Sequence, residues 1–119
     1  MAATPVVSEV MRALADPTRL GIYQQILIAR EATVGTLTTA AGVSQPAVSQ
    51  HLRVLQDVHL ITGRKDGRNV YYRPDPRGMK PLSEWLRYYE RFWHESFDRL
   101  DDYLQELTAE EKKDARKKR

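Results

Sequence analysis

Apolar residues recur at helical spacing between residues 43 and 60, a segment that reads VSQPAVSQHLRVLQDVHL. Val48, Leu52 and Leu55 stand at i, i+4 and i+7, a spacing that lines one face of an α-helix. Polar residues fill most positions between them. The pattern therefore predicts a helix that packs through one apolar face onto a core and leaves its other face in solvent.

The start of this helix carries separate signals. The hydroxyl of Ser44 can accept a hydrogen bond from a free amide of the first turn, and Pro46 suits a turn that has no use for its missing N–H. The helix is therefore predicted to begin near Gln45. Its outward side chains are of the kinds that can read base edges in a major groove: Gln45, Ser49, Gln50 and Arg53.

A shorter helix is predicted just before it, over residues 33–41 (TVGTLTTAA). Val34 and Leu37 share one face, and Thr33 is placed to cap the first turn. Gly42 then permits a tight turn between the two helices. Two short helices joined in this way are typical of a helix-turn-helix, although the pattern also occurs in helical proteins that bind no nucleic acid.

Two short extended runs follow, over residues 60–65 and 69–73, and Val70, Tyr71 and Tyr72 in the second run have high strand propensity. Asp66 and Gly67 between them are a strong signal for a tight turn, so the sequence predicts a β-hairpin. A hairpin alone would be an ordinary solvated surface, but one that follows a recognition helix is the wing of a winged helix. Its cations can meet phosphate or the minor groove: Arg64, Lys65, Arg68 and Arg73.

The N-terminal part predicts two helices, over residues 6–15 and 17–29. Asp16 is a candidate cap and Pro17 suits the first helical position. We interpret Asp16 and Arg19 as a helix cap and a local ion pair rather than as contacts to DNA or to an inducer. The second helix carries an apolar stripe: Leu20, Tyr23, Ile26 and Leu27.

The last predicted helix carries a heptad repeat over about 26 residues, with apolar positions spaced alternately four and three apart. Ser96 is the one polar residue in the repeat, which runs through Leu82, Leu86, Tyr89, Trp93, Ser96, Leu100, Tyr103 and Leu107. One helix cannot cover so much apolar surface by itself, so part of it should bury against a second copy of the chain. We therefore expect a homodimer.

These elements together predict a mainly α fold with a β-hairpin (α+β), namely a winged helix-turn-helix of about five helices in the order ααααββα. At 119 residues the chain is expected to form one domain. We place this domain, with dimerisation helices at both ends, at residues 1–107. Residues 108–119 are predicted to be a charged, disordered tail whose role the sequence leaves open.

Charge is distributed unevenly along the chain. Residues 30–80 carry eight Lys or Arg against four Asp or Glu, whereas residues 81–111 carry three against nine. The predicted DNA face is therefore basic and the last helix acidic. The chain has no cysteine, no apolar run long enough to cross a bilayer and no signal-peptide pattern, so we expect a cytoplasmic protein without thiol chemistry.

Three segments together resemble the ArsR/SmtB family of bacterial winged-helix repressors: ALADPTRLGIYQQIL (13–27), VSQPAVSQHLRVLQ (43–56) and NVYYRPDP (69–76). The resemblance implies a homodimer, held together by its first and last helices, that binds a double-stranded DNA operator and leaves it when an inducer binds. The chain departs from the family at His59, where the family usually has glycine. A left-handed backbone is expected there.

Two sets of site residues follow. The expected DNA-binding residues are Ser44, Gln45, Pro46, Ser49, Gln50, His51, Arg53, Arg64, Lys65, Arg68 and Asn69. His51 falls on the core-facing side of its helix, so we interpret it as a packed residue or a phosphate contact. The expected dimer interface comprises Leu82, Leu86, Tyr89, Trp93, Leu100 and Leu107.

A metal-responsive repressor is an alternative. His94, Glu95 and Asp98 form a histidine and carboxylate patch of a kind that suits regulatory nickel or zinc. The metal site that the family carries on this helix needs an acid and a histidine where this chain has Pro81 and Ser83. We therefore expect no metal or other cofactor and treat the patch as solvated helix surface.

The sequence argues against two other classes of protein. A protein-interaction module that has lost DNA binding would use the heptad repeat, but the basic wing and the polar helix face argue against it. An enzyme is excluded because the sequence has no glycine-rich phosphate loop, no metal-hydrolase motif and no cysteine nucleophile. The sequence leaves open the inducer, the operator and whether the regulator represses or activates.

Overall fold

The computed structural model describes residues 6–92 and 97–117, without the side chains of residues 97 and 98. The chain divides into two compact units, Met1–Trp85 and Leu86–Arg119. The first unit holds the winged helix-turn-helix. The second holds the end of one helix and all of the next.

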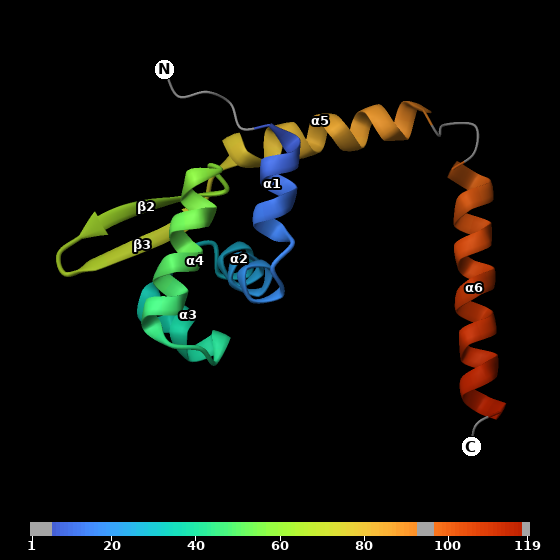
Figure 1. Ribbon diagram of the computed structural model, residues 1–119, viewed down its shortest axis with the longest axis horizontal. Coiled ribbons are helices and arrows are strands. Elements are labelled where there is room, and N and C mark those ends of the chain that lie inside the picture. Colours follow the sequence, from blue (N-terminus) through green and yellow to red (C-terminus); the bar gives the residue numbers. More distant parts are fainter. Residues whose placement is uncertain (1–5, 93–96, 118–119) are drawn as a thin grey trace. The chain divides into compact units, whose positions relative to one another are not determined.

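The elements follow one another as α1 (Val7–Leu14), α2 (Pro17–Ala29), β1 (Ala32–Thr33), α3 (Val34–Ala41), α4 (Gln45–Asp57), β2 (Ile61–Asp66), β3 (Asn69–Pro74), α5 (Pro76–Phe92) and α6 (Phe97–Lys117) (Figure 1). The mainly helical winged fold is confirmed. Within the described ranges there are six helices rather than about five, together with a short strand β1 that the sequence did not predict.

The core of the first unit forms where α2, α3 and α4 pack together. The fully buried side chains come from these three helices, from α1, and from the turn and strand that follow α4: Val10, Ile22, Ile26, Leu37, Val48, Leu52, Leu55, Leu60 and Ile61. Each buried aliphatic side chain of this size contributes about 1.5–3 kcal/mol relative to exposure. Of the apolar stripe on α2, Tyr23 and Ile26 are buried, whereas Leu20 and Leu27 are exposed.

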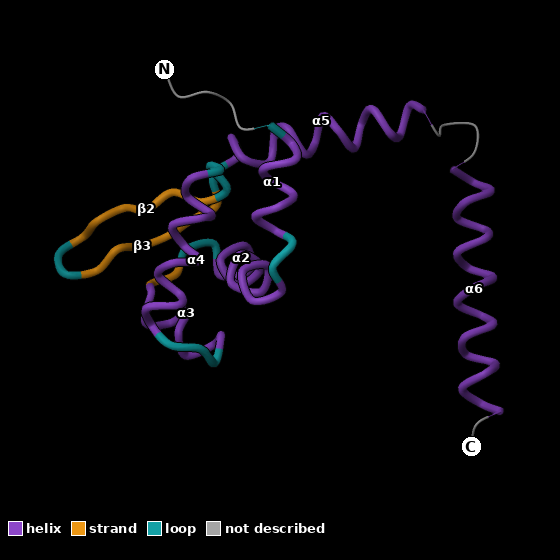
Figure 2. The backbone as a smooth tube through the Cα atoms, viewed as in Figure 1, coloured by secondary structure: helices purple, strands orange, loops and turns teal. Residues whose placement is uncertain are grey.

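The wing is the outer part of a three-stranded antiparallel sheet with the strand order β1-β3-β2 (Figure 2). Asp66 pairs with Asn69, so the hairpin loop consists of Gly67 and Arg68, one residue later than the sequence suggested. Gly67 has φ +63°, a conformation that glycine adopts without strain. On the other side of β3, Ala32 pairs with Tyr72.

The start of α5 lies directly against the turn that joins α4 to β2. His59 has φ 59°, which confirms the expected left-handed conformation, and its carbonyl oxygen accepts a hydrogen bond of 2.8 Å from the amide of Gly78. A Cβ atom on Gly78 would lie 2.6 Å from the carbonyl carbon of His59 and 2.7 Å from the nitrogen of Leu60. Glycine is therefore required for this approach.

The C-terminal region differs from the prediction of one helix followed by a tail. The structure describes two helices, and α5 begins at Pro76, six residues before the predicted heptad repeat. Helix α6 continues to Lys117, so residues 108–117 are helical where a disordered tail was expected. None of the described helices has both the length and the apolar character that crossing a membrane requires.

Candidate nucleic-acid interface

Helix α4 has the two faces that the sequence predicted. Val48, Leu52 and Leu55 are buried in the core, and the hydroxyl of Ser44 accepts a hydrogen bond of 3.3 Å from the amide of Ala47. This bond caps the first turn, which begins at Gln45 as expected. The exposed residues of the helix include Gln45, Pro46, Ser49, Gln50 and Arg53.

The turn before α4 fixes how α3 and α4 meet. The Thr33 hydroxyl caps α3 by accepting a hydrogen bond of 3.3 Å from the amide of Thr36. Gly42 ends α3 with φ 68°, the left-handed conformation that lets the chain reverse into α4. The structure thus brings α3 and α4 together as a helix-turn-helix with the exposed side of α4 facing solvent.

The cations of the wing fall into two kinds. Lys65 and Arg68 are exposed, and their charged groups have no ion-pair partner within the described ranges. Arg64 instead donates a 2.6 Å hydrogen bond to the carboxylate of Glu31, and its guanidinium lies 5.1 Å from the ring centroid of Tyr71. The pKa of Arg64 is raised, chiefly by the hydrogen bond to Glu31.

The partnership of Arg64 therefore changes how the wing can act. Glu31 stands 33 residues before Arg64, so sequence periodicity gave no signal for the pair. A cation whose charge is already offset gains less from a phosphate than a free one does. Lys65 and Arg68 are thus the stronger anion-binding groups of the two kinds, with Asn69 exposed beside them.

The corner between α1 and α2 contains a second contact that the sequence did not predict. Asp16 caps α2 as expected, because its carboxylate accepts a hydrogen bond of 2.9 Å from the amide of Arg19. This bond is the main cause of the lowered pKa of Asp16. The guanidinium of Arg19 makes no ion pair with Asp16; it contacts α1 and, at 3.4 Å, the Nδ1 atom of His51 on α4.

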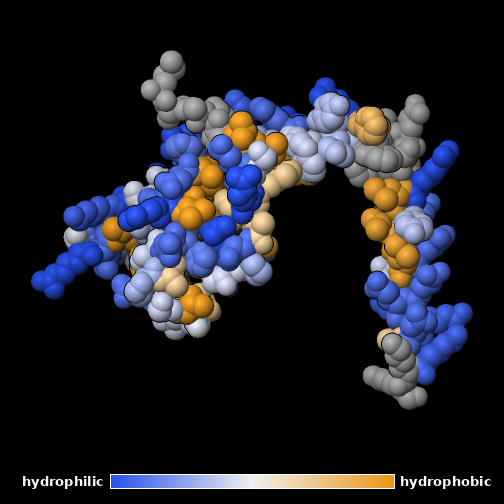
Figure 3. All heavy atoms as spheres, in the orientation of Figure 1, coloured by the Kyte–Doolittle hydropathy of each residue, from blue (hydrophilic) through white to orange (hydrophobic). Residues whose placement is uncertain are grey.

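Apolar side chains of the heptad repeat are exposed in the second unit. Leu86 is 54% exposed, Tyr89 42%, Leu100 41% and Leu107 37%, whereas Leu82, at the end of the first unit, is half-buried. Trp93 lies outside the described residues. Figure 3 shows hydrophobic residues along one side of the N-terminal half of α6, beside hydrophilic ones, whereas its C-terminal half is mostly hydrophilic.

The candidate metal ligands cannot be placed as a site. His94 and Glu95 lie outside the described residues, and the side chain of Asp98 is not described. In the described part of the chain, no three His, Cys, Asp or Glu side chains gather as metal ligands would.

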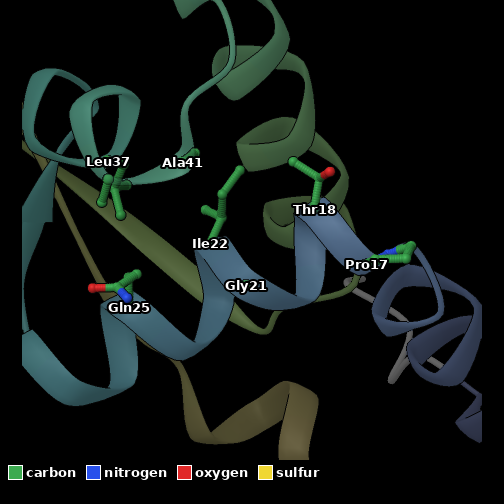
Figure 4. A pocket seen from close by; sticks show the side chains of 8 residues that line it. Pro17, Thr18, Gly21, Ile22, Gln25, Leu37 and Ala41 are labelled. Atoms are coloured by element: carbon green, nitrogen blue, oxygen red, sulfur yellow. The ribbon is translucent and has the colours of Figure 1, made fainter.

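A shallow hollow of about 240 Å³ opens between α2 and α3. Figure 4 shows the lining side chains of Thr18, Ile22 and Gln25 on α2 and of Leu37 on α3. Gly21 lines it as well, and a Cβ atom there would meet nothing within 4 Å. The hollow is thus open next to Gly21 and does not include the exposed face of α4.

Known proteins are similar to this chain in both sequence and fold. A family model described as a helix-turn-helix domain matches residues 14–64. The HTH-type transcriptional regulator Rv2034 of Mycobacterium tuberculosis is 38% identical over 99 residues, which cover 83% of this chain and 86% of that protein. A probable mercury resistance operon repressor of Streptomyces lividans is 48% identical over 56% of this chain, and the match spans about half (53%) of the repressor.

Solved structures agree. The crystal structure of a possible transcriptional regulator for arsenical resistance has a TM-score of 0.63 and 39% sequence identity, covering 79% of this chain and 94% of that one. The crystal structure of an ArsR family transcriptional regulator has a TM-score of 0.64 and 25% identity, covering 73% of this chain and 89% of that one.

Proposed function

Because this chain belongs to the ArsR/SmtB family of helix-turn-helix transcriptional regulators, we propose that it is a homodimeric repressor. It binds an inverted-repeat DNA operator and leaves the operator when an inducer binds. The family is one of transcriptional regulators and not of enzymes. The exposed polar face of α4, backed by three buried aliphatic residues, is the single observation that carries the proposal.

Base reading is assigned to the N-terminal half of α4. Gln45, Ser49 and Gln50 are exposed on the first two turns of the helix, and the N-terminal residues of a recognition helix are those that meet base edges in the major groove. An amide can pair with adenine through two hydrogen bonds, and a hydroxyl can serve either as donor or as acceptor. These side chains therefore set which sequence is bound.

Phosphate binding is assigned to the wing and to the edge of α4. Lys65 and Arg68 are exposed cations without an ion-pair partner in the described structure, and Arg53 is an exposed cation on α4. Contacts of this kind position the protein on the duplex without reading its sequence. They also make binding strongly salt-dependent, because each neutralised phosphate releases counterions.

Dimerisation is assigned to the apolar side chains of α5 and α6. Leu86, Leu100 and Leu107 remain exposed within the second unit, and an exposed apolar stripe of this kind is typical of a protein interface. A two-fold dimer places its two recognition helices about 34 Å apart, one turn of B-DNA. An inverted-repeat operator follows from this symmetry.

The test is duplex binding by fluorescence anisotropy, with DNA from the protein's own promoter region and random DNA of equal length. Gln50→Ala should reduce the ratio of the two affinities, whereas Arg68→Ala should weaken both duplexes alike. Gln24→Ala and Arg87→Ala are matched controls, because they remove an exposed amide from α2 and an exposed cation from α5. A protein that is dimeric but binds its promoter no better than random DNA at moderate salt would contradict the proposal.

A further inference from the structure

Arg19 lies where three helices of the first unit meet. Its Nε donates to the carbonyl oxygen of Ala13, and its Nη2 donates over 3.3 Å to the carbonyl oxygen of Arg12. Its Nη1 lies 3.4 Å from Nδ1 of His51 on α4. All three guanidinium nitrogens of Arg19 therefore have a partner.

The two carbonyl oxygens hold the guanidinium in place. They belong to the last turn of α1 (Val7–Leu14), where a cation is favoured by the helix dipole, and the carbonyl oxygen of Arg12 also accepts a hydrogen bond of 3.2 Å from the amide of Ala15. The planar guanidinium is then fixed in orientation as well as in position. Its third nitrogen is directed at His51 from a rigid base.

This contact selects one form of the histidine ring. A guanidinium has five N–H donors and no acceptor, and it stays protonated in proteins. A neutral imidazole has one nitrogen that donates and one that accepts. Because Nδ1 of His51 faces Arg19, it must be the acceptor, and the ring proton is then on Nε2.

The other ring nitrogen of His51 is available to a ligand. His51 is half-buried. Within the described residues, one buried side-chain nitrogen or oxygen has no hydrogen-bond partner, and it is the hydroxyl oxygen of Tyr23. Among the described residues Nε2 of His51 likewise has no hydrogen-bond partner, and because Tyr23 supplies the one buried case there, Nε2 of His51 reaches solvent. It stands on the same helix as the exposed residues Ser49, Gln50 and Arg53.

We propose that Arg19 is a positioning residue that holds His51 in the form protonated on Nε2, so that His51 donates a hydrogen bond from Nε2 to a phosphate oxygen of bound DNA. The proposal rests on the proposed function, because it assigns a contact within the same interface. Phosphate oxygens are acceptors only, so they match an N–H and repel the lone pair that the other tautomer would present. Arg19 itself does not touch the duplex.

The first test needs no DNA. A ¹⁵N NMR spectrum of the histidine rings, recorded at about pH 8 where an ordinary imidazole is neutral, should show a pyridine-like Nδ1 and a pyrrole-like Nε2 for His51. The signals are assigned by their loss in His51→Gln. Arg19→Met should shift them toward the average of two exchanging tautomers, whereas Arg19→Lys keeps a donor. A pyrrole-like Nδ1, or His51 signals unchanged by Arg19→Met, would overturn the proposal.

The second test measures duplex affinity. Glutamine places its amide nitrogen near the position of Nε2 of histidine, and asparagine places it near Nδ1. His51→Gln should therefore bind about 2- to 10-fold more tightly than His51→Asn, the effect of one ordinary hydrogen bond, on promoter and random duplexes alike. Equal affinities of the two variants, or a difference confined to the promoter duplex, would exclude the phosphate contact.

A double-mutant cycle separates positioning from folding. Arg19→Met should weaken DNA binding in the native background and have a smaller effect in His51→Gln, because an amide has no tautomer for Arg19 to set. Equal effects in both backgrounds would mean that Arg19 acts only through the stability of α1. The NMR result separates failure of the proposed function from failure of this inference. A protein with the expected tautomer that binds no duplex refutes the proposed function. A DNA-binding protein with the other tautomer refutes only the inference about Arg19 and His51.

Discussion

Replacing Gly78 with alanine should destabilise the protein, although the same change usually strengthens a helix. The amide of Gly78 donates to the carbonyl oxygen of His59 over 2.8 Å. An added Cβ atom would lie 2.6 Å from the carbonyl carbon of His59 and 2.7 Å from the nitrogen of Leu60. These are backbone atoms, so no side-chain rotation can relieve the clash, and either the α4–β2 turn or the start of α5 must move.

The expected size of the effect follows from three contributions. Glycine to alanine within a helix normally stabilises by about 0.5–1 kcal/mol. Overpacking of a filled site costs about 1–3 kcal/mol, and loss of the hydrogen bond between Gly78 and His59 costs about 1 kcal/mol more. With the overpacking cost near its upper value, because the clash is with backbone, Gly78→Ala should lower the free energy of unfolding by about 3 kcal/mol.

Urea unfolding, followed by circular dichroism at one protomer concentration, measures this change. Gly21→Ala is the matched control, because Gly21 is also helical but its Cβ would meet nothing within 4 Å. The control should gain about 0.5–1 kcal/mol. A Gly78→Ala protein that unfolds at the same urea concentration as the native protein, or above it, would refute the assignment of Gly78 as a close contact.

Two further predictions concern charged side chains. Arg64→Gln should reduce the slope of log affinity against log salt by less than the roughly 0.9 expected for a full phosphate contact, because a carboxylate already offsets this guanidinium. Arg68→Gln should reduce the same slope by about 0.9. Equal reductions in the two variants would contradict the division of the wing cations into paired and unpaired ones. The pKa of Asp75 is lowered, chiefly by a hydrogen bond from the Arg77 side chain. The ionised Asp75 carboxylate therefore contributes stability above the ordinary carboxyl pKa, and this contribution is lost as the pH falls through the lowered pKa. Asp75→Asn should therefore lose stability less steeply than the native protein between about pH 7 and pH 2. The measurement is the urea midpoint of unfolding at each pH, with Asp57→Asn as the control. Parallel curves for all three proteins would argue against a stabilising role for the Asp75 carboxylate.

The parts of the fold that local signals determine were predictable from the sequence. Helix α2 runs over Pro17–Ala29 as predicted, and the caps Asp16, Thr33 and Ser44 all accept the expected amide hydrogen bonds. A cap acts over three residues and a helical face over seven, so both can be read from a short window. The buried face of α4 was predicted for the same reason.

The parts that depend on distant partners were not predictable. Strand β1 has two residues and exists because it pairs with β3, about 40 positions along the chain. Glu31 binds Arg64 and Arg19 contacts His51 across 33 and 32 residues respectively, and neither pair follows a helical or strand period. The heptad repeat begins at Leu82, so it gave no signal for the helical residues before it, and Pro81, which lies inside α5, argues against a helix there.

The pairing of the sheet has a consequence for how the protein behaves at high concentration. Strand β3 is paired on both sides, whereas β2 pairs on one side only in the described structure, so β2 presents a row of backbone groups to which another chain could add a strand. Its exposed residues Arg64, Lys65 and Asp66 make that edge a poor template, since a charge must be desolvated when a strand is added. The charges of the wing therefore protect the protein from edge-to-edge aggregation even when no DNA is bound.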